Sequence, residues 1–507
     1  MNWIKNIAWQ LFLGSLLLSS CYDDMGNYDY HEFNEVTINK KGFDTIYQVT
    51  SFVDTIRINP ILDYKLSENK NLKFEWVAVS NALGYTEYRL GKEQNLVYPV
   101  SLPTGSYGLY FKVKDTVNTM EYVKTAGIEV RDLLSRGWVL LGENDEGTIQ
   151  MDMLAMGGDT ILMKNILQES GLPPLKDPVK VWVIDYYRDN MIHVSTKDGT
   201  YRLDRNTFQG GEHTHFKYAF FDPNTLDHYV LKEAFQLRSY CRGLIVDDLF
   251  FHTSSLIETT MIGNPSNHYK GNYDLFPMGQ KFGFNMKANS QTIVGYDCRA
   301  KRFVYAGGRA HDAPSGYCDS LVDTRSDVDI YSWKTDMDYV TTINSRFLEG
   351  YTYTVLKDAN NYYLYSYKLT SSYWGHGVVK NKRYEIVNAT DFDKAEYYGA
   401  SGLRTFLIYT VGSKVYAYDY SAQKLKMIKD FQDQEITCFF YDILYETGSN
   451  DDFFYVATYD PGLPKATGGT LTKFKVVDDP NEIIIEEVSG SKWDGLCKIT
   501  SMDFKKN

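Results

Sequence analysis

Pairs of short apolar stretches joined by tight turns recur through the last roughly 370 residues of the chain, at intervals of about 40 to 60 residues. Within each stretch apolar and polar residues alternate, as they do in strands that bury one face. The turn Lys197-Asp198-Gly199 contains Asp-Gly, the strongest short signal for a hairpin. One such unit cannot bury its faces alone, so the recurrence predicts an all-β chain with a β-propeller-like domain of about seven blades. A continuous array of β-sandwiches is the structural alternative.

The predicted strands of this region form groups separated by turn residues. They are residues 137–142 and 148–151; 181–184, 192–195 and 201–203; 243–246; 292–297 and 302–305; 351–356 and 362–367; 406–409 and 415–419; and 453–459 and 470–476. One segment departs from the pattern. Residues 160–172 carry apolar side chains at helical spacing (Ile161, Leu162, Ile166 and Leu167), with Gly171 and Pro173 where a helix would end, so we expect one short helix there.

A separate unit precedes the repeats, at residues 37–131. The stretches 45–49, 55–58 and 71–77 alternate at period two, and the last places Leu72, Phe74 and Trp76 on one face. Turn residues 103–106 lead into a strand at 107–115, and a further strand follows at 120–130. About 95 residues of short strands around a tryptophan predict an immunoglobulin-like β-sandwich in which Trp76 belongs to the core. Residues 131–136 are the expected linker, and the propeller domain is expected over residues 132–507.

The first 20 residues have the pattern of an export signal. Lys5 precedes an apolar run over residues 7–18, which is shorter than the roughly 20 residues that span a bilayer. Ser19 and Ser20 then supply the small residues of a cleavage site before Cys21. Leu18-Ser19-Ser20-Cys21 resembles the lipobox of bacterial lipoproteins, and this resemblance implies lipid attachment at Cys21. An uncleaved signal anchor is the alternative.

Charge and hydropathy restrict what the remaining chain contacts. Residues 21–36 are acidic and rich in turn residues, which indicates a tether. After Cys21 no apolar run approaches 18 residues, so we expect contact with the membrane through the lipid anchor only. The net charge is −12 and no basic block occurs, which argues against nucleic-acid binding.

The cysteines after the anchor are odd in number and match no zinc or redox spacing. They are Cys241, Cys298, Cys318, Cys438 and Cys497. A disulfide between Cys298 and Cys318 is compatible with an oxidising compartment, but the sequence does not show whether their Cα atoms lie within disulfide range. We expect buried free thiols at most of the five positions.

Metal chemistry has weak support in the sequence. Glu212-His213-Thr214-His215 carries two imidazoles on one face of a strand, but no third ligand follows from the spacing, and exposed loop histidines explain the motif as well. The pairs Asp327/Asp329 and Asp336/Asp338 lack the glycine and the terminal glutamate of an EF-hand loop. We therefore predict no metal site and no cofactor.

Catalytic motifs are also missing from the sequence. It contains no Gly-x-Ser-x-Gly elbow, no phosphate-binding glycine loop and no His-Glu-x-x-His helix. With 65 acidic residues, the sequence cannot select a pair of carboxylates for glycoside hydrolysis. We predict a protein without catalytic residues. Because propeller hydrolases carry dispersed catalytic residues, a hydrolase or lyase stays open as the alternative.

Aromatic residues in two glycine-rich loops are the candidate ligand contacts. The first loop holds Tyr373, Trp374 and His376, and the second holds Tyr269 and Tyr273. Exposed rings in loops suit stacking against sugars or peptide side chains. Packing of the same rings between blades is the competing interpretation.

The order of these parts resembles a known family. A lipobox, the stretch Cys21-Tyr22-Asp23-Asp24-Met25-Gly26-Asn27-Tyr28-Asp29-Tyr30, a PKD-like module with Trp76 and Val113–Asp115, and a large β region are similar to the PKD-like lipoproteins of the Bacteroidetes phylum. In that group the acidic pair after the lipidated cysteine resembles a surface-export signal, and Asp23-Asp24 fits it.

The resemblance implies a location and a role. It implies an outer-membrane, lipid-anchored protein that faces the cell exterior. It also implies an accessory subunit of SusC/SusD-type importers that helps to capture an oligopeptide or glycan cargo, with a slight preference for peptide because no carbohydrate-active motif occurs. We therefore carry two hypotheses, a non-catalytic surface binding protein and a propeller hydrolase or lyase acting on the same cargo. Convergent carboxylates or histidines at the propeller axis would favour the enzyme.

Overall fold

The computed structural model describes residues 34–506, apart from residues 52–53, 67–70, 81–84, 132, 157–159, 185–190, 237–240, 255–260, 286–291, 308–315, 326–328, 371–376 and 444–450. The chain divides into two compact units, with the boundary between Arg131 and Asp132. Regular structure in the described residues is almost entirely β, and the helical elements among them are short 3-10 turns. The all-β prediction is confirmed.

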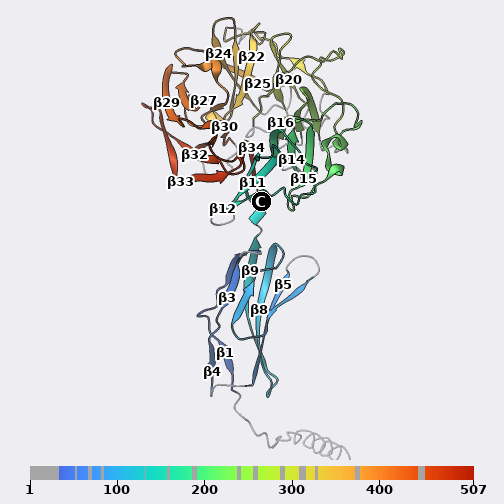
Figure 1. Cartoon of the computed structure of the whole chain (residues 1–507), viewed down its shortest axis with the longest axis vertical. Coiled ribbons are helices and arrows are strands. Elements are labelled where there is room, and N and C mark those ends of the chain that lie inside the picture. The colour runs from blue at the N-terminus through green and yellow to red at the C-terminus, as the bar shows by residue number, and fades with distance from the viewer. Residues whose placement is uncertain are drawn as a thin grey trace, which may run out of the picture. The chain divides into compact units, whose positions relative to one another are not determined.

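The first unit is a β-sandwich. Its larger sheet has the order β2 (Ile46–Thr50), β9 (Glu121–Arg131), β8 (Gly105–Asp115), β5 (Leu72–Ser80) and β6 (Glu87–Gly91). Two smaller pairs face it, β1 (Val36–Ile38) with β4 (Leu62–Tyr64) and β3 (Thr55–Ile58) with β7 (Leu96–Pro99) (Figure 1).

Trp76 is the centre of this sandwich. It is fully buried, stacks on Phe111 with ring centroids 4.2 Å apart, and lies 5.9 Å from the ring of Phe43. Its indole Nε1 donates to the carbonyl oxygen of Glu93 at 2.9 Å, so the polar atom of a buried tryptophan is satisfied. The prediction that Trp76 is a core residue is confirmed.

The second unit is a β-propeller of seven sheets arranged around one axis (Figure 1). Blade 1 is β34 (Lys498–Lys505), β10 (Gly137–Glu143), β11 (Ile149–Ala155) and β12 (Ile161–Met163). Blade 2 is β13 (Pro178–Ile184), β14 (Met191–Thr196) and β15 (Gly199–Asp204), and blade 3 is β16 (Leu231–Gln236), β17 (Cys241–Val246) and β18 (Leu249–Ser254).

The remaining blades follow in chain order. Blade 4 is β19 (Ile293–Asp297), β20 (Arg302–Ala306) and β21 (Asp319–Ser320); blade 5 is β22 (Asp338–Asn344), β23 (Tyr351–Lys357), β24 (Tyr362–Leu369) and β25 (Val378–Ile386). Blade 6 is β26 (Tyr398–Ala400), β27 (Phe406–Val411), β28 (Lys414–Asp419) and β29 (Lys424–Asp430), and blade 7 is β30 (Glu435–Tyr441), β31 (Asp452–Tyr459), β32 (Gly469–Val477) and β33 (Ile484–Leu496). The blade count of about seven is confirmed.

The last strand closes the ring. β34 pairs antiparallel with β10, so blade 1 combines the C-terminal strand with the first three strands of the propeller. Gly142 makes this pairing possible, because a Cβ at this position would clash with the carbonyl oxygen of Lys498 and the thiol of Cys497. β34 also lies beside β13 and β30, the inner strands of the neighbouring blades.

Most inner strands carry a β-bulge close to their start. One residue is skipped in the pairing with the second strand of the blade, which re-aims the side chains that follow. The skipped residues are Thr500 in β34, Val179 in β13, Lys232 in β16, Val340 in β22 and Thr437 in β30.

Blade 4 has an irregular inner strand. Residues 278–283 run antiparallel to β19 through the bridges Met278↔Asp297 and Gly283↔Val294. The same segment lies beside β22, where the side-chain amide of Asn344 donates to the Phe282 carbonyl oxygen at 3.0 Å. Blade 4 therefore reaches the axis like the other blades, without a regular strand.

The short helix expected over residues 160–172 is wrong. Ile161–Met163 instead forms β12, the outer strand of blade 1, and pairs with Met153–Ala155. The chain then turns at Asn165, whose backbone N–H donates to Asp152 at 2.9 Å, and Ile166 and Leu167 pack on the core between blades 1 and 2. Three apolar strand residues followed by a turn have the same spacing as one face of a helix. The stretch is too short to distinguish the strand period of two residues from the helical period of 3.6.

A buried ionic network joins blades 5, 6 and 7. Asp452 is fully buried and accepts hydrogen bonds from the Ser401 hydroxyl at 2.6 Å, the Tyr441 hydroxyl at 2.8 Å and the Gly402 N–H at 3.0 Å. Arg346 pairs with it at 3.2 Å. Because Arg346 follows the inner strand of blade 5, Ser401 and Gly402 follow that of blade 6, and Tyr441 and Asp452 belong to blade 7, this carboxylate fixes three blades to one another.

Four cysteines of the described chain are free thiols. Cys318, Cys438 and Cys497 are buried and free, and Cys298 is free and half-buried, so free thiols are confirmed at these four positions and Cys298 does not pair with Cys318. Cys21 lies outside the described residues. In the described part of the chain, no helix is long and apolar enough to cross a membrane.

Replacing Gly142 with alanine tests the ring closure. We expect Gly142→Ala to lower the free energy of unfolding by about 1–3 kcal/mol or more, because the added Cβ forces β34 away from β10. Gly263→Ala is the matched control, since no atom lies within 4 Å of the Cβ that it would add. Urea unfolding curves of both variants measure the difference, and equal midpoints would show that the closure tolerates displacement of β34.

Candidate functional site

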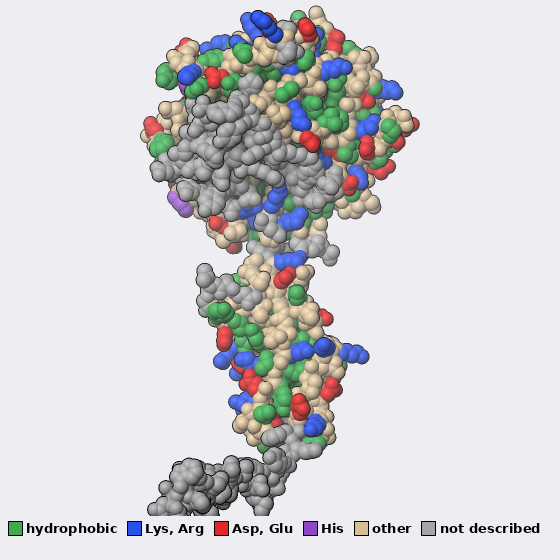
Figure 2. All heavy atoms as spheres, turned by 180° about the vertical axis from the view of Figure 1, so that it is seen from behind, with side chains coloured by type: hydrophobic (Ala, Val, Ile, Leu, Met, Phe, Trp, Pro, Cys, Tyr) green, Lys and Arg blue, Asp and Glu red, His purple; other side chains and the backbone are tan. Residues whose placement is uncertain are grey.

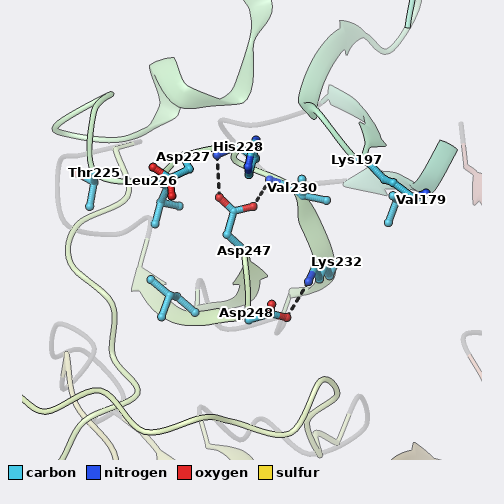
Figure 3. A pocket seen from close by; sticks show the side chains of 11 residues that line it. Val179, Lys197, Thr225, Leu226, Asp227, His228, Val230, Lys232, Asp247 and Asp248 are labelled. Carbon is cyan, nitrogen blue, oxygen red and sulfur yellow. Dashed lines mark hydrogen bonds and ion pairs between the residues drawn. The ribbon is translucent and has the colours of Figure 1, made fainter. Parts of the chain in front are cut away.

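A depression of about 590 Å³ opens between blades 2 and 3, on the face where the inner strands begin (Figure 3). The β14–β15 turn and the β17–β18 turn flank it. Its charged and polar lining is Lys197, Thr225, Asp227, His228, Lys232, Asp247 and Asp248, and its apolar lining is Val179, Leu226, Val230 and Leu249.

Asp247 holds one wall of the depression in place. Its carboxylate accepts hydrogen bonds from the backbone N–H groups of His228, Tyr229 and Val230 at 3.1, 2.8 and 2.8 Å. Figure 3 shows the carboxylate pointing into this loop. Asp247 and Asp248 both have positive φ, 49° and 69°, as the central residues of a type I′ hairpin turn do. The turn therefore presents one aspartate to the loop and the other to the depression.

The lysines of the depression are paired at its rim. Lys232 lies 2.7 Å from Asp248, and Lys197 lies 3.5 Å from Asp177. These pairs are solvent-exposed, so each stabilises the fold by only about 0–1 kcal/mol and is readily exchanged for a ligand. The depression thus offers both signs of charge in an open setting.

A second group of charged residues lies on the inner strands of the propeller. Two of them directly follow residues that line the depression. The bulged residues Val179 and Lys232 line the depression, and the residues that follow them, Lys180 and Glu233, stand on adjacent inner strands. Lys281 comes from the inner segment of blade 4, where its backbone carbonyl accepts from the Tyr339 hydroxyl at 3.1 Å.

Asp503 completes the axis cluster from β34. The backbone N–H of Val183 in β13 donates to its Oδ2 at 2.7 Å. We use the name axis cluster for Lys180, Glu233, Lys281 and Asp503. No local motif marks these residues in the sequence. Their only sequence signal is a charged side chain near the start or end of an inner strand.

Burial shifts the proton affinities of the axis cluster. Burial raises the pKa of Glu233, and the charges of Lys281 and Lys180 act in the opposite direction. It also raises the pKa of Asp503 to about 6, despite hydrogen bonds from Val183 and Phe504 that favour the carboxylate. Burial lowers the pKa of Lys281, which the charge of Glu233 partly offsets. Clustered groups with shifted pKa values are typical of functional sites, and a carboxylate with a raised pKa is suited to donating a proton.

The predicted aromatic contacts lie apart from the depression or outside the described residues. Tyr269 is half-buried and its hydroxyl donates to Asp297 at 2.7 Å, whereas Tyr273 in the same loop is 82% exposed. Neither lines the depression. Tyr373, Trp374 and His376 lie outside the described residues.

The histidine motif has a structural role at His215. Its Nδ1 accepts from the backbone N–H of Lys217 at 3.1 Å, and its ring packs edge-on against Tyr201 and Tyr229. Asp336 and Asp338 lie within 3.8 and 2.9 Å of lysine ammonium groups. Among the residues that the structure describes, no group of three or more candidate ligands gathers around a metal position.

The face drawn in Figure 2 carries no large basic patch among the residues that it colours. Figure 2 shows basic and acidic side chains interspersed over the visible face of each unit, without a large patch of one sign among the residues it colours. Nucleic-acid binding requires clustered lysine and arginine. This face therefore agrees with the acidic net charge.

Fold and site together define a β-sandwich followed by a seven-bladed propeller with a charged depression. Residues 21–171 match the PKD-like family, so the N-terminal part of the chain is PKD-like. No curated protein matches the chain.

Solved structures resemble the chain only distantly. A quinonprotein alcohol dehydrogenase-like protein of Bacteroides thetaiotaomicron is 13% identical with a TM-score of 0.39, and the match covers 93% of this chain and 99% of that one. AztD of Citrobacter koseri is 9% identical with a TM-score of 0.35, over 86% and 99% of the two chains. Regucalcin of Agrobacterium tumefaciens is 13% identical with a TM-score of 0.26, over 54% and 85%. None of these likenesses is close enough to carry an inference about this chain.

Asp247→Asn tests the anchor of the depression. The three N–H groups use both carboxylate oxygens, and an amide keeps only one oxygen, so the loop loses at least one charge-assisted bond. We expect amide hydrogen exchange at residues 228–230 to become about tenfold faster or more, measured by mass spectrometry. Asp248→Asn is the control, because it removes only the exposed pair with Lys232. Equal exchange in the two variants would contradict the anchoring role.

Asp503→Asn tests the electrostatics of the axis. Because the pKa of Asp503 is about 6 in the folded state and an unfolded aspartate has a pKa of about 3.9, the folded protein retains a proton that the unfolded chain has lost. Stability should therefore fall as pH rises from about 4 through 6. The variant does not titrate, so between pH 4.5 and 7.5 the wild type should lose about 1–2 kcal/mol more stability than the variant, after allowance for partial solvent access. The amide also replaces one of the two oxygens that accept from Val183 and Phe504, a cost that is the same at both pH values. Unfolding curves at pH 4.5 and 7.5 measure this difference; a constant difference between the two pH values would contradict it.

Proposed function

We propose that the protein is a non-catalytic cell-surface lipoprotein that assists nutrient capture as an accessory subunit of a SusC/SusD-type outer-membrane importer. In this proposal lipid on Cys21 anchors the chain to the outer membrane, facing the cell exterior. The PKD-like unit serves as a rigid spacer, and the propeller presents the binding face to an oligopeptide or glycan cargo.

The open, mixed-charge depression between blades 2 and 3 is the observation that carries the binding role. It combines a preformed wall, held by Asp247, with exposed lysine and aspartate side chains whose rim pairs exchange at little cost. Ligand sites are typically concave and preformed, with a few placed polar groups.

The chemistry of the lining supports a peptide more than a neutral glycan. Peptides carry terminal and side-chain charges that lysine and aspartate can match. Neutral sugars are usually held by stacking on aromatic rings, and no phenylalanine, tyrosine or tryptophan is among the residues that line the depression. The preference for an oligopeptide therefore gains a physical argument beyond the lack of carbohydrate-active motifs.

A hydrolase or lyase acting on the same cargo is the second candidate. Two carboxylates at the axis, Glu233 and Asp503, have raised pKa values, and this is the pattern of a general acid. Turnover of a peptide or polysaccharide that Glu233→Gln abolishes would favour this candidate. Lys180 and Lys281 weigh against it, because their charges favour the ionised form of Glu233.

Affinity purification of the native lipoprotein from outer membranes tests the accessory role. We expect importer subunits to be recovered with the protein in detergent, identified by mass spectrometry. Cys21→Ser is the matched control, because the unlipidated chain should leave the membrane fraction and recover no importer. Recovery of the wild-type lipoprotein without any importer subunit would contradict docking.

A further inference from the structure

One end of the β-sandwich carries exposed aliphatic side chains. The strand register places four segments at this end, which are the start of β1, the end of β4, the start of β5 and the turn between β8 and β9 (Figure 1). Leu66 follows β4 and is 54% exposed, and Val117 and Met120 lie in the β8–β9 turn and are 67% and 47% exposed. We use the name apolar tip for these three side chains.

Hydrogen bonds join these segments. The N–H of Leu66 donates to the side-chain oxygen of Asn34 at 2.9 Å, so the end of β4 lies beside the first described residue of the chain. The N–H of Thr116 donates to the carbonyl oxygen of Asn71 at 3.0 Å, so the β8–β9 turn lies beside the start of β5. The sandwich therefore begins, in chain order, at the same end as the apolar tip.

The β8–β9 turn is preformed. Asp115 is buried, and its carboxylate accepts hydrogen bonds from the N–H groups of Val117 and Asn118 at 2.8 and 3.3 Å. The Asp115 N–H donates to the carbonyl oxygen of Met120 at 2.9 Å, which closes the turn. Val117 and Met120 are thus held in their exposed positions by the backbone of a fixed turn.

The fold itself makes no use of the apolar tip. None of its three side chains belongs to the hydrophobic core of the described sandwich. Turn residues are usually glycine, asparagine, aspartate or serine, which either adopt positive φ or hydrogen-bond to the backbone, and valine and methionine do neither. Single exposed aliphatic residues are common, but a group of them marks an interaction surface.

We propose that the apolar tip contacts the lipid surface to which Cys21 anchors the chain. The inference rests on the proposed function, because it requires the lipid on Cys21. Asn34 comes 13 residues after Cys21, and a stretch of that length spans at most about 45 Å when fully extended. Because Leu66 is bonded to Asn34, this connection also limits how far the tip can lie from the membrane.

The chemistry of the tip fits lipid better than a protein partner. Protein–protein interfaces take most of their binding energy from tryptophan, tyrosine and arginine seated in pockets, and the tip consists of leucine, valine and methionine at a projecting end of the unit. Aliphatic groups enter the boundary between headgroups and acyl chains to a depth of about 5–10 Å. Such a contact is weak alone but adds to a lipid anchor, as a second membrane signal does.

The contact fixes the direction of the sandwich. β9 begins at Glu121 beside the tip and ends at Arg131 at the opposite end of the unit. With the tip at the membrane, β9 therefore leads the chain away from the lipid surface. No apolar run marks this second contact in the sequence, because Leu66 and Val117 come from segments that lie far apart in the chain.

A fluorophore beside the tip tests the lipid contact. An environment-sensitive dye attached through Thr119→Cys reports on the turn in the purified full-length lipoprotein, on vesicles of phosphatidylethanolamine and phosphatidylglycerol. Cys241→Ser and Cys298→Ser prevent labelling elsewhere, since the remaining described thiols are buried. We expect nitroxide-bearing lipids to reduce the emission by about twofold or more, because a tip at the depth of the headgroup boundary brings the dye into contact with them.

Charged variants assign the quenching to the tip. Val117→Asp together with Met120→Asp should abolish it, because a carboxylate is costly to place among acyl chains. Val97→Asp is the matched control, since Val97 is 56% exposed in β7, where it pairs with Arg57 away from the tip. It should leave the quenching unchanged. All of these variants should keep the thermal melting point of the wild type, because the replaced side chains are exposed.

Flotation with the vesicles separates the tip contact from the anchor. Lipoprotein that floats but is not quenched, or that is quenched equally in the charged variant, would overturn the tip contact and leave the proposed function standing. Lipoprotein that does not float would remove the anchor and the tip contact together. A dye that responds in native outer membranes but not in lipid vesicles would assign the tip to a protein partner, and would also overturn the proposal.

Discussion

The pairing of β34 with β10 is the contact on which the propeller depends. It joins Lys498–Lys505 to Gly137–Glu143, so the ring closes only when the last strand of the chain has found the first. Without it, β10 and the inner strands of blades 2 and 7 would expose backbone groups and apolar faces to water. The same pairing brings Asp503 to the N–H of Val183, and thus completes the axis cluster. The closure that stabilises the fold also assembles the candidate site.

The fold was largely predictable because the signals for hairpins are local. Strands such as Tyr351–Lys357 and Tyr362–Leu369 alternate in sequence and are joined by turn residues, so their pairing follows from adjacent positions. The error at residues 160–172 arose where an apolar run was too short to separate a period of two from one of 3.6. The inner segment 278–283 was missed for the opposite reason, because its irregular pairing leaves no alternation to detect.

The abundance of tyrosine has a structural explanation in the described residues. Tyr367, Tyr409 and Tyr418 are fully buried between blades, and the hydroxyl groups of Tyr353 and Tyr420 hydrogen-bond to each other at 2.7 Å. A ring that fills the space between two sheets while its hydroxyl finds a partner suits a propeller, in which every sheet is packed on both faces. Composition could therefore indicate the fold, but it could not indicate which tyrosines meet a ligand.

The candidate site was not predictable from the sequence. It is marked only by a change of residue type, from uncharged to charged, at a position that recurs in five blades. Five inner strands contain a β-bulge. Because the bulge recurs in five blades, it belongs to the propeller scaffold and does not by itself mark a functional site. The residue after the bulge is Ser501, Thr341 or Cys438 in three blades, and all three are buried. In blades 2 and 3 it is Lys180 and Glu233, which are only half-buried. Five blades thus tolerate the same backbone distortion, and only in the two that border the depression is the residue after the bulge charged. That coincidence of charge and depression is the reason to place the candidate site in this sector of the propeller.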